Sequence, residues 1–466
     1  MRFFWLAALL VLHVLLGVGC KLSSLFALAH ASGTFLFGIY LLVRWRGPFP
    51  LACWGAYVVG SEVLWRMANA PVPWQYADFS LCFVLLLGLA RTGLRRLPWV
   101  PAAYFVLLLP AVIFTLAQVP LMAARRAVSF NLSGPLAVMV CSLFCSRLQL
   151  DDRRMQRLMV WLVVPVAAIA AAVFFGLSTT EVVFRSQSNF AATGGFGPNQ
   201  VSCILGLGAL YGLLLALDPG VGIKLRVVFV VLALWFAAHA ALSFSRTGIY
   251  LIGGGLLTAM PFLSLKRLLR PGTIIIVSVT VVAGLVTWGY LVHFTGGKVS
   301  ERFARRDFSN RDSIAGEELQ IWRENILFGA GVGMSAETRE ESTGVHVASH
   351  TEYTRLVSEH GLFGFLAGVL LLTACFRPLT INFPAFTKAA VLASLAFALF
   401  YLAASGMRTA SPGFLFGLAF AGPALAHRVC RRQSVQRSAF PHLQSSIRGP
   451  VGPPFQSLVR PPTSAL

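Results

Sequence analysis

Long apolar runs alternate with short polar connections along most of this 466-residue chain. A run of roughly 17–25 apolar residues forms a helix long enough to cross a bilayer. Runs of this kind predict about fourteen membrane-spanning helices. They lie at residues 3–19, 22–43, 49–66, 76–90, 99–119, 129–146, 158–177, 199–217, 226–242, 247–263, 272–293, 360–376, 386–404 and 410–427. The pattern therefore predicts an all-α fold, a polytopic transmembrane bundle of about 12–14 spans.

The composition agrees with a membrane protein. Hydrophobic residues make up 57% of the chain and charged residues only 12%, whereas about a quarter of an ordinary soluble domain is charged. We interpret residues 3–19 as the first span rather than a signal peptide, because they begin a series and no convincing cleavage site follows them. The eight cysteines show no metal-ligand spacing, and most are interpreted as small core residues.

The basic residues indicate how the spans are oriented. The formal net charge is +21, and the basic residues form short clusters between apolar runs. This distribution favours membrane topology over nucleic-acid binding. The positive-inside rule places alternate connections and both termini in the cytoplasm. Those connections carry Arg44 and Arg46; Arg91, Arg95 and Arg96; Arg147, Arg153, Arg154 and Arg157; Lys224 and Arg226; Lys266, Arg267 and Arg270; and Arg377 and Lys388.

One long connection, residues 294–359, breaks this rule. It falls on the external side but carries many basic residues: Lys298, Arg302, Arg305, Arg306, Arg311, Arg323, Arg339 and Arg355. Long translocated segments largely escape the charge rule, yet the excess of external arginine suggests an anionic ligand at the outer surface. Within this connection, residues 313–327 have the pattern of a short amphipathic helix. The glycines Gly329, Gly331 and Gly333 end that helix.

Three arginines on the external side are candidates for binding a phosphate. Arg246 lies between two long apolar runs, where a charge at the bilayer centre costs about 2.5–3.5 kcal/mol. Arg185 lies in the connection 178–198, and Arg311 in the long connection. Arginine forks match phosphate oxygens bidentately, so converging forks can hold a diphosphate. The alternative is that these arginines are interfacial residues whose charged ends reach water.

His350 is the candidate for proton transfer. It precedes a span and has Glu352, Arg355 and Glu359 nearby in the chain, and histidine is the side chain best suited to accept a proton near neutral pH. The alternative is a histidine that only caps the helix. His346 lies four residues before it, but no carboxylate of a zinc-protease pattern accompanies the pair. We therefore predict no metal site.

At this point several short motifs together resemble the O-antigen ligase and polymerase superfamily of bacterial integral membrane glycosyltransferases. The motifs are Gly197-Pro198-Asn199-Gln200; Ser243-Phe244-Ser245-Arg246-Thr247-Gly248; Arg311, Ile321-Trp322-Arg323 and Gly329-Ala330-Gly331-Val332-Gly333; and His350-Thr351-Glu352-Tyr353 with Glu359-His360-Gly361-Leu362-Phe363-Gly364. Each motif is short, but their order, spacing and sidedness agree over residues 195–425. Thr351 departs from the pattern, which has asparagine there.

The resemblance implies a polyprenyl-diphosphate-linked glycan as donor and a glycan or lipid hydroxyl as acceptor. Transfer would take place on the periplasmic side of the bacterial inner membrane, without a nucleotide sugar, cofactor or metal. Arg246 and Arg311 would hold the diphosphate, with Arg185 as a further candidate, and His350 would assist the acceptor hydroxyl. The supporting residues in the matched motifs are Glu352, Tyr353, Arg323 and Glu359.

The function predicted from the sequence is thus an O-antigen ligase-like glycan transfer. A polymerase with the same chemistry remains an alternative, as does a non-enzymatic transporter of lipid-linked glycans. A transporter should line a path through the bilayer with charge, whereas the candidate charges gather on one side. The predicted organisation is residues 1–178 as N-terminal transmembrane helices, 179–427 as the ligase-like membrane domain, and 428–466 as a basic, disordered cytoplasmic tail.

Overall fold

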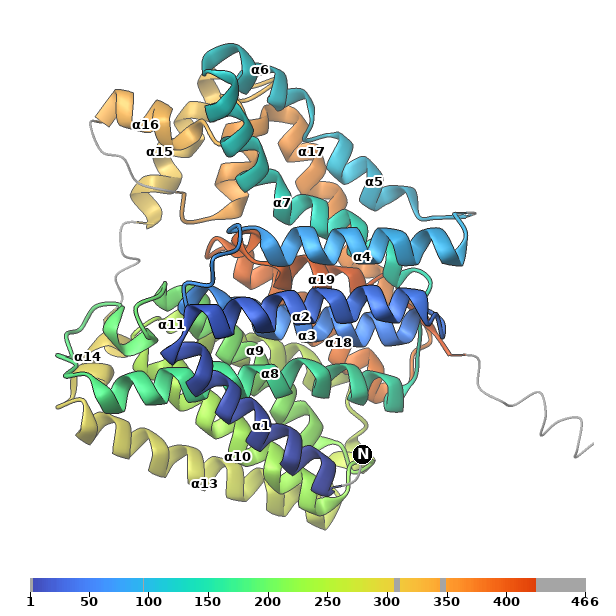
Figure 1. Cartoon of the computed structure of the whole chain (residues 1–466), viewed down its shortest axis with the longest axis vertical. Helices are drawn as coiled ribbons and strands as arrows, with labels where there is room; N and C mark the ends of the chain where they lie inside the picture. The colour runs from blue at the N-terminus through green and yellow to red at the C-terminus, as the bar shows by residue number, and fades with distance from the viewer. Residues whose placement is uncertain (1–2, 95, 306–310, 344–348, 425–466) are drawn as a thin grey trace, which may run out of the picture. The chain divides into compact units, whose positions relative to one another are not determined.

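The computed structural model of the chain describes residues 3–94, 96–305, 311–343 and 349–424 (Figure 1). Most of this part is helical, and the only strands among the described residues have two residues each, as the all-α prediction requires. The helices are α1 (Phe3–Leu22), α2 (Ser24–Val43), α3 (Pro48–Met67), α4 (Tyr76–Thr92), α5 (Trp99–Val106), α6 (Pro110–Gln118), α7 (Leu121–Cys145), α8 (Asp152–Thr179), α9 (Pro198–Leu217), α10 (Ile223–Leu242), α11 (Arg246–Ala259), α12 (Leu265–Leu268), α13 (Pro271–Phe294), α14 (Lys298–Ala304), α15 (Arg311–Glu324), α16 (Ser335–Thr343), α17 (Glu352–Thr380), α18 (Ala385–Leu402) and α19 (Ala410–Leu418).

Short elements complete the described residues. Three 3₁₀ turns, η1 (Ala191–Thr193), η2 (Met260–Phe262) and η3 (Gly406–Arg408), join helices. Two-residue strands β1 (Gln149–Leu150) and β2 (Gly422–Pro423) pair in parallel. The predicted tail from 428 lies outside the described residues, so its predicted disorder stays a prediction.

Ten segments of the described chain are long and apolar enough to cross a membrane: α1, α2, the α5–α6 segment Trp99–Gln118, α7, α8, α9, α10, α13, α17 and α18. They indicate a multi-pass membrane protein. Four predicted spans are not among them, because α4, α11 and α19 have only 17, 14 and 9 residues. The fourth, α3, has 20 residues but contains Glu62 and Arg66.

One predicted span contains a break, and two predicted boundaries were wrong. The span predicted at 99–119 corresponds to the segment Trp99–Gln118, but the helix breaks between α5 and α6, because Pro110 has no N–H and its ring clashes with the preceding turn. The helix predicted at 410–427 ends at Leu418, and the chain then reaches β2. The helix predicted at 360–376 already begins at Glu352, so the polar residues before it are helical rather than part of a loop.

The polar residues of α3 are tolerated because this helix lies inside the protein. Fifteen of its residues are buried, among them Glu62. Small residues let its neighbours approach closely: a Cβ added to Gly60 would lie 2.6 Å from the backbone oxygen of Leu162 in α8. Membrane helices commonly pack through such small residues. The centre of the bundle is therefore protein packed on protein, and Glu62 pairs there with Arg66 of the same helix.

In contrast, α13 lies at the edge of the bundle. Only Thr273, Ile276 and Leu291 of its 24 residues are buried. The remaining valine, isoleucine and leucine side chains are largely exposed, as expected for a helix surrounded by lipid. Figure 1 shows α13 beside α10, with which it is in contact. Its C-terminal end leads through Thr295–Gly297 into the short helix α14.

Candidate functional site

Three of the motifs singled out in the sequence are connected by the segment 404–408. The amide of Asn199, at the start of α9, donates to the Ala404 carbonyl at 2.7 Å. The Ser245 hydroxyl, one residue before Arg246, donates to the Asn199 side-chain oxygen at 3.2 Å. The Ser405 hydroxyl donates to the Ser349 carbonyl at 2.9 Å, and Ser349 precedes His350. Ser405 itself has a φ of 59°, a strained backbone conformation that is common at functional sites.

The segment 404–408 ends in Arg408, whose guanidinium donates to the same Ser349 carbonyl at 3.1 Å. Burial lowers the pKa of Arg408, and the nearby Glu352 carboxylate opposes this shift. The guanidinium also lies over the Phe130 ring, 5.9 Å from its centroid. Arg408 therefore connects the His350 segment with α7.

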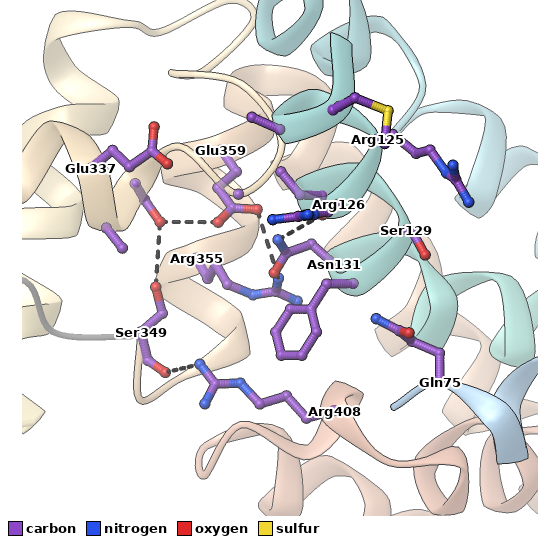
Figure 2. A pocket seen from close by; sticks show the side chains of 17 residues that line it. Gln75, Arg125, Arg126, Ser129, Asn131, Glu337, Ser349, Arg355, Glu359 and Arg408 are labelled. Atoms are coloured by element: carbon purple, nitrogen blue, oxygen red, sulfur yellow. Dashed lines mark hydrogen bonds and ion pairs between the residues drawn. The ribbon is translucent and has the colours of Figure 1, made fainter. Parts of the chain in front are cut away.

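A pocket of about 700 Å³ lies where α7, α17, η3 and the 333–337 segment meet. Figure 2 shows its lining, with Arg355 from α17, Arg408 from η3 and Asn131 from α7 gathered around one space. The charged side chains that line it are four arginines and two glutamates: Arg125, Arg126, Arg355, Arg408, Glu337 and Glu359. Arg125 and Arg126 are exposed and have no hydrogen-bond or ion-pair partner among the residues that the structure describes. The pocket is thus suited to an anionic group.

Arg355 forms the charged centre of this pocket. Its Nε donates to Glu352 at 2.7 Å, and a terminal nitrogen lies 3.7 Å from Glu359 Oε2. It also donates to the Asn131 side-chain oxygen. Glu359 Oε1 accepts from the Ser335 hydroxyl at 3.0 Å, whereas Oε2 has no hydrogen bond in the described part of the chain. The one arginine therefore balances two buried carboxylates and still faces the pocket.

The start of α17 explains the unusual threonine in the motif. Thr351 caps the helix, because its hydroxyl accepts from the Thr354 N–H at 3.2 Å. The capping role that was the alternative for His350 is therefore performed by Thr351. His350 is half-buried and lies between this cap and the pocket residue Ser349.

The glycine-rich turn packs against a kink in α17. Gly361 has φ 61° and ψ −138°, and the backbone around it pairs with the turn: the Ala330 N–H donates to the Ser358 carbonyl at 2.8 Å. A Cβ added to Gly361 would lie 2.6 Å from the Gly329 nitrogen, and one added to Gly329 would lie 2.3 Å from the Glu359 carbonyl carbon. Glycine is thus required at both positions, and their contact holds Glu359 at the pocket.

Replacing Gly361 with alanine should destabilise the protein, since the backbone conformation alone costs about 1–3 kcal/mol for a non-glycine residue. Thermal unfolding of the purified protein in detergent would measure this loss. Gly316→Ala is a matched control, because Gly316 lies in α15 with nothing within 4 Å of an added Cβ. That variant should be about 0.5–1 kcal/mol more stable. Equal melting temperatures for Gly361→Ala and the wild type would contradict the close contact.

Arg246 lies at a different place, in contact with α14. Its guanidinium donates to the Arg305 carbonyl. Close by, Arg302 Nε donates to the Phe244 carbonyl at 3.1 Å, and Phe244 has a φ of 57°. The structure does not place Arg246 among the residues that line the pocket. It is linked to the pocket through Ser245 and Asn199.

The remaining predicted residues are more scattered. Arg185 is exposed in the segment before η1, and Arg323 is exposed near the end of α15. Arg311 is the first residue of α15, and its side chain lies outside what the structure describes. Tyr353 donates to the Leu399 carbonyl at 2.7 Å and so ties α17 to α18. Of the predicted supporting residues, only Glu352 and Glu359 join the arginine cluster of the pocket.

Sequence reasoning missed Arg125, Arg126 and Arg408. All three lie on the side predicted to be external, where the charge rule disfavours basic residues. Arg125 and Arg126 are therefore external basic residues, like those of the long connection, and they indicate an anionic ligand in the same way. The span in this region is predicted to start at residue 129, so both arginines fall in the connection before it, which carries no motif.

A buried ion pair in α3 contacts the backbone of Arg408. Arg66 pairs with Glu62 and donates to the Arg408 carbonyl at 2.7 Å. Glu62 also accepts from the Ala410 N–H at 2.9 Å, at the start of α19. Both sides of η3 are thus fixed by charged groups of α3. No pattern in the sequence suggested this contact, because 342 residues separate Arg66 from Arg408.

Among the described residues, no group of three or more His, Cys, Asp or Glu side chains could hold a metal ion. His346, the partner in the i, i+4 histidine pair, lies outside them. No protein-family model matches the chain. No curated protein matches its sequence either.

Proposed function

We propose that this protein is a membrane glycosyltransferase that moves a glycan from a polyprenyl diphosphate to an acceptor hydroxyl. The reaction would take place at the periplasmic face of the bacterial inner membrane. The proposal rests on the motif resemblance and on one structural observation: four arginines line a single pocket beside His350. The resemblance led to Arg246 and His350, and the pocket adds Arg125, Arg126, Arg355 and Arg408.

The charge of the pocket supports a diphosphate ligand. Two of its six charged groups are carboxylates, and Glu359 is already paired with Arg355. The guanidiniums of Arg125 and Arg126 remain available for a ligand. Diphosphate is a good leaving group, so fixed positive charge contributes more to its departure than a protonating acid would. These arginines would stabilise the charge that develops as the glycan leaves.

The position of His350 supports a role on the acceptor side. An acceptor hydroxyl is a weak nucleophile and gains from a base. His350 follows Ser349, which lies in the pocket wall, and the structure already assigns the helix cap to Thr351. We infer that the acceptor enters beside this segment while the diphosphate lies among the arginines.

The double variant Arg125→Gln/Arg126→Gln tests this assignment with little risk to the fold, because both side chains are exposed. A charge-assisted hydrogen bond contributes about 1.5–3 kcal/mol, so donor binding should weaken at least about tenfold. Arg408→Gln should have a similar effect. Arg246→Ala belongs to the same series, since the resemblance implies that Arg246 also contacts the diphosphate. Binding and transfer would be measured in proteoliposomes with a lipid-linked glycan and an acceptor.

Lys298→Gln is the matched control. It removes one positive charge on the same predicted side of the membrane, at an exposed ion pair with Glu301 that does not line the pocket. It should leave donor binding unchanged. If the double variant binds donor as tightly as the wild type does, the diphosphate assignment is wrong. Donor binding without any transfer to an acceptor would instead favour the transporter.

A further inference from the structure

A second pocket lies at the ends of four helices and shares no lining residue with the first. Its volume is about 740 Å³, and it lies where α8, α10 and α13 begin and where α9 ends. All four helices are long and apolar enough to cross a membrane. Because helix ends of this kind meet the lipid head groups, the pocket lies at head-group depth. It contains four arginines and two aspartates: Arg153, Arg157, Arg267, Arg270, Asp152 and Asp218.

The two aspartates are satisfied by the protein itself. Asp218 is buried and accepts from the Gln156 amide at 2.6 Å and from the Gly220 N–H at 2.9 Å. Asp152 accepts from the Thr387 N–H at 3.1 Å and from its hydroxyl at 2.9 Å. Arg267 lies between them, 3.3 Å from Asp152 and 3.6 Å from Asp218. One arginine and two carboxylates therefore form a closed cluster.

The other three arginines have no such partners. Arg153, Arg157 and Arg270 are exposed, and across the described ranges none of them has a hydrogen-bond or ion-pair partner. All three line the pocket. Arg153 and Arg157 are four residues apart and so lie on one face of α8. Three guanidiniums thus border one space with their donors available to an anion.

One side of this pocket is apolar. Val160 and Trp161 continue the face of α8 that carries Arg157, and Leu225 and Phe229 of α10 lie with them in the lining. Trp161 is 39% exposed, and tryptophan is enriched at the membrane–water interface. An arginine rim that leads into an apolar wall fits a molecule with a charged head and a hydrocarbon chain. A free ion would use only the rim.

We propose that this pocket binds the phosphate of an anionic phospholipid head group, with the first part of an acyl chain along α8 and α10. Basic pockets between transmembrane helices bind acidic lipids in this way. The site does not depend on the proposed glycan transfer, because it shares no residue with the first pocket and its ligand is part of the bilayer. The positive-inside prediction would place it in the cytoplasmic leaflet.

Native mass spectrometry of the full chain in detergent would test the site. The protein would be titrated with phosphatidylglycerol and, separately, with phosphatidylcholine of the same acyl chains. We expect tighter binding of phosphatidylglycerol. A basic side chain near an anionic lipid contributes about fivefold, so Arg153→Gln/Arg157→Gln/Arg270→Gln should weaken binding on the order of a hundredfold. Arg270→Gln alone should weaken it about fivefold.

The matched control is Arg44→Gln/Arg46→Gln/Arg91→Gln, which removes three exposed arginines from the same predicted side but none from the pocket. This variant should bind phosphatidylglycerol as the wild type does. Equal binding of the two lipids, or wild-type binding by both pocket variants, would overturn the proposal. Displacement of the lipid by inorganic phosphate alone would also overturn it, because the ligand would then be free phosphate.

Discussion

Replacing Arg355 with alanine is expected to lower the free energy of unfolding by about 3–5 kcal/mol, because the change leaves two buried carboxylates without their cation. The side chains of Glu352 and Glu359 are 7% and 3% exposed. Arg355→Lys should recover part of this loss, but lysine lacks the planar fork that reaches Glu352 and Asn131 together. Chemical or thermal unfolding in detergent would give the values.

A double-mutant cycle makes this prediction specific. If the loss comes from an unbalanced charge, then Glu359→Gln in the Arg355→Ala background should restore part of the stability. Arg323→Ala serves as the control, since Arg323 is exposed, and its change should stay within about 0.5 kcal/mol. A loss in the double variant that equals the sum of the two single losses would show that no charge coupling exists. The buried cluster would then contribute only packing.

His350→Ala is expected to reduce the rate of glycan transfer about 10²–10⁴-fold, the usual contribution of a positioned base. This prediction rests on the proposed function. Donor binding should remain nearly intact, because in the proposed function the arginines, and not the histidine, would hold the diphosphate. The variants of Arg125, Arg126 and Arg408 should weaken donor binding as well as turnover. Measuring both quantities therefore distinguishes the role of His350 from that of the arginines.

His293→Ala is a suitable control for this variant, because His293 is an exposed histidine at the end of α13 and does not line the pocket. It should transfer glycan at the wild-type rate. Wild-type turnover in His350→Ala would remove the histidine from the mechanism. Activity that returns only after addition of a divalent metal would indicate a ligand role shared with His346.

The helical architecture could be predicted because a bilayer imposes a length and an apolar composition on each span. The apolar runs gave nearly correct positions for helices such as α1, α9 and α18. The errors occurred where polar residues are buried in protein rather than exposed to lipid. The segment 352–359 contains Glu352, Arg355 and Glu359 and is therefore predicted to be part of a loop, yet these charges pair with one another inside α17.

The candidate site was harder to predict, because its parts are distant in the chain. Motif order and sidedness pointed to His350 and to Glu352 and Glu359, and these do lie in or beside the pocket region. The contact of Asn199 with Ala404 spans 205 residues, and no local pattern encodes such a pairing. Arg408 is a single basic residue between two apolar runs. Only the fold shows that its neighbours are Ser349 and Arg355.

Because α13 has few buried side chains, we expect the thickness of the membrane to affect the position of this helix. A helix of 24 residues is about 36 Å long, several ångströms more than the hydrocarbon core of an average bilayer. Only three of its side chains are buried, so the bundle restrains α13 at few points, and a change in bilayer thickness can be met by a change in its tilt. The C-terminal end of α13 leads into α14, which holds the Phe244 and Arg246 turn through Arg302 and Arg305. A thinner or thicker bilayer therefore acts on that turn, and the lipid chain length belongs among the conditions that any assay of this protein must hold constant.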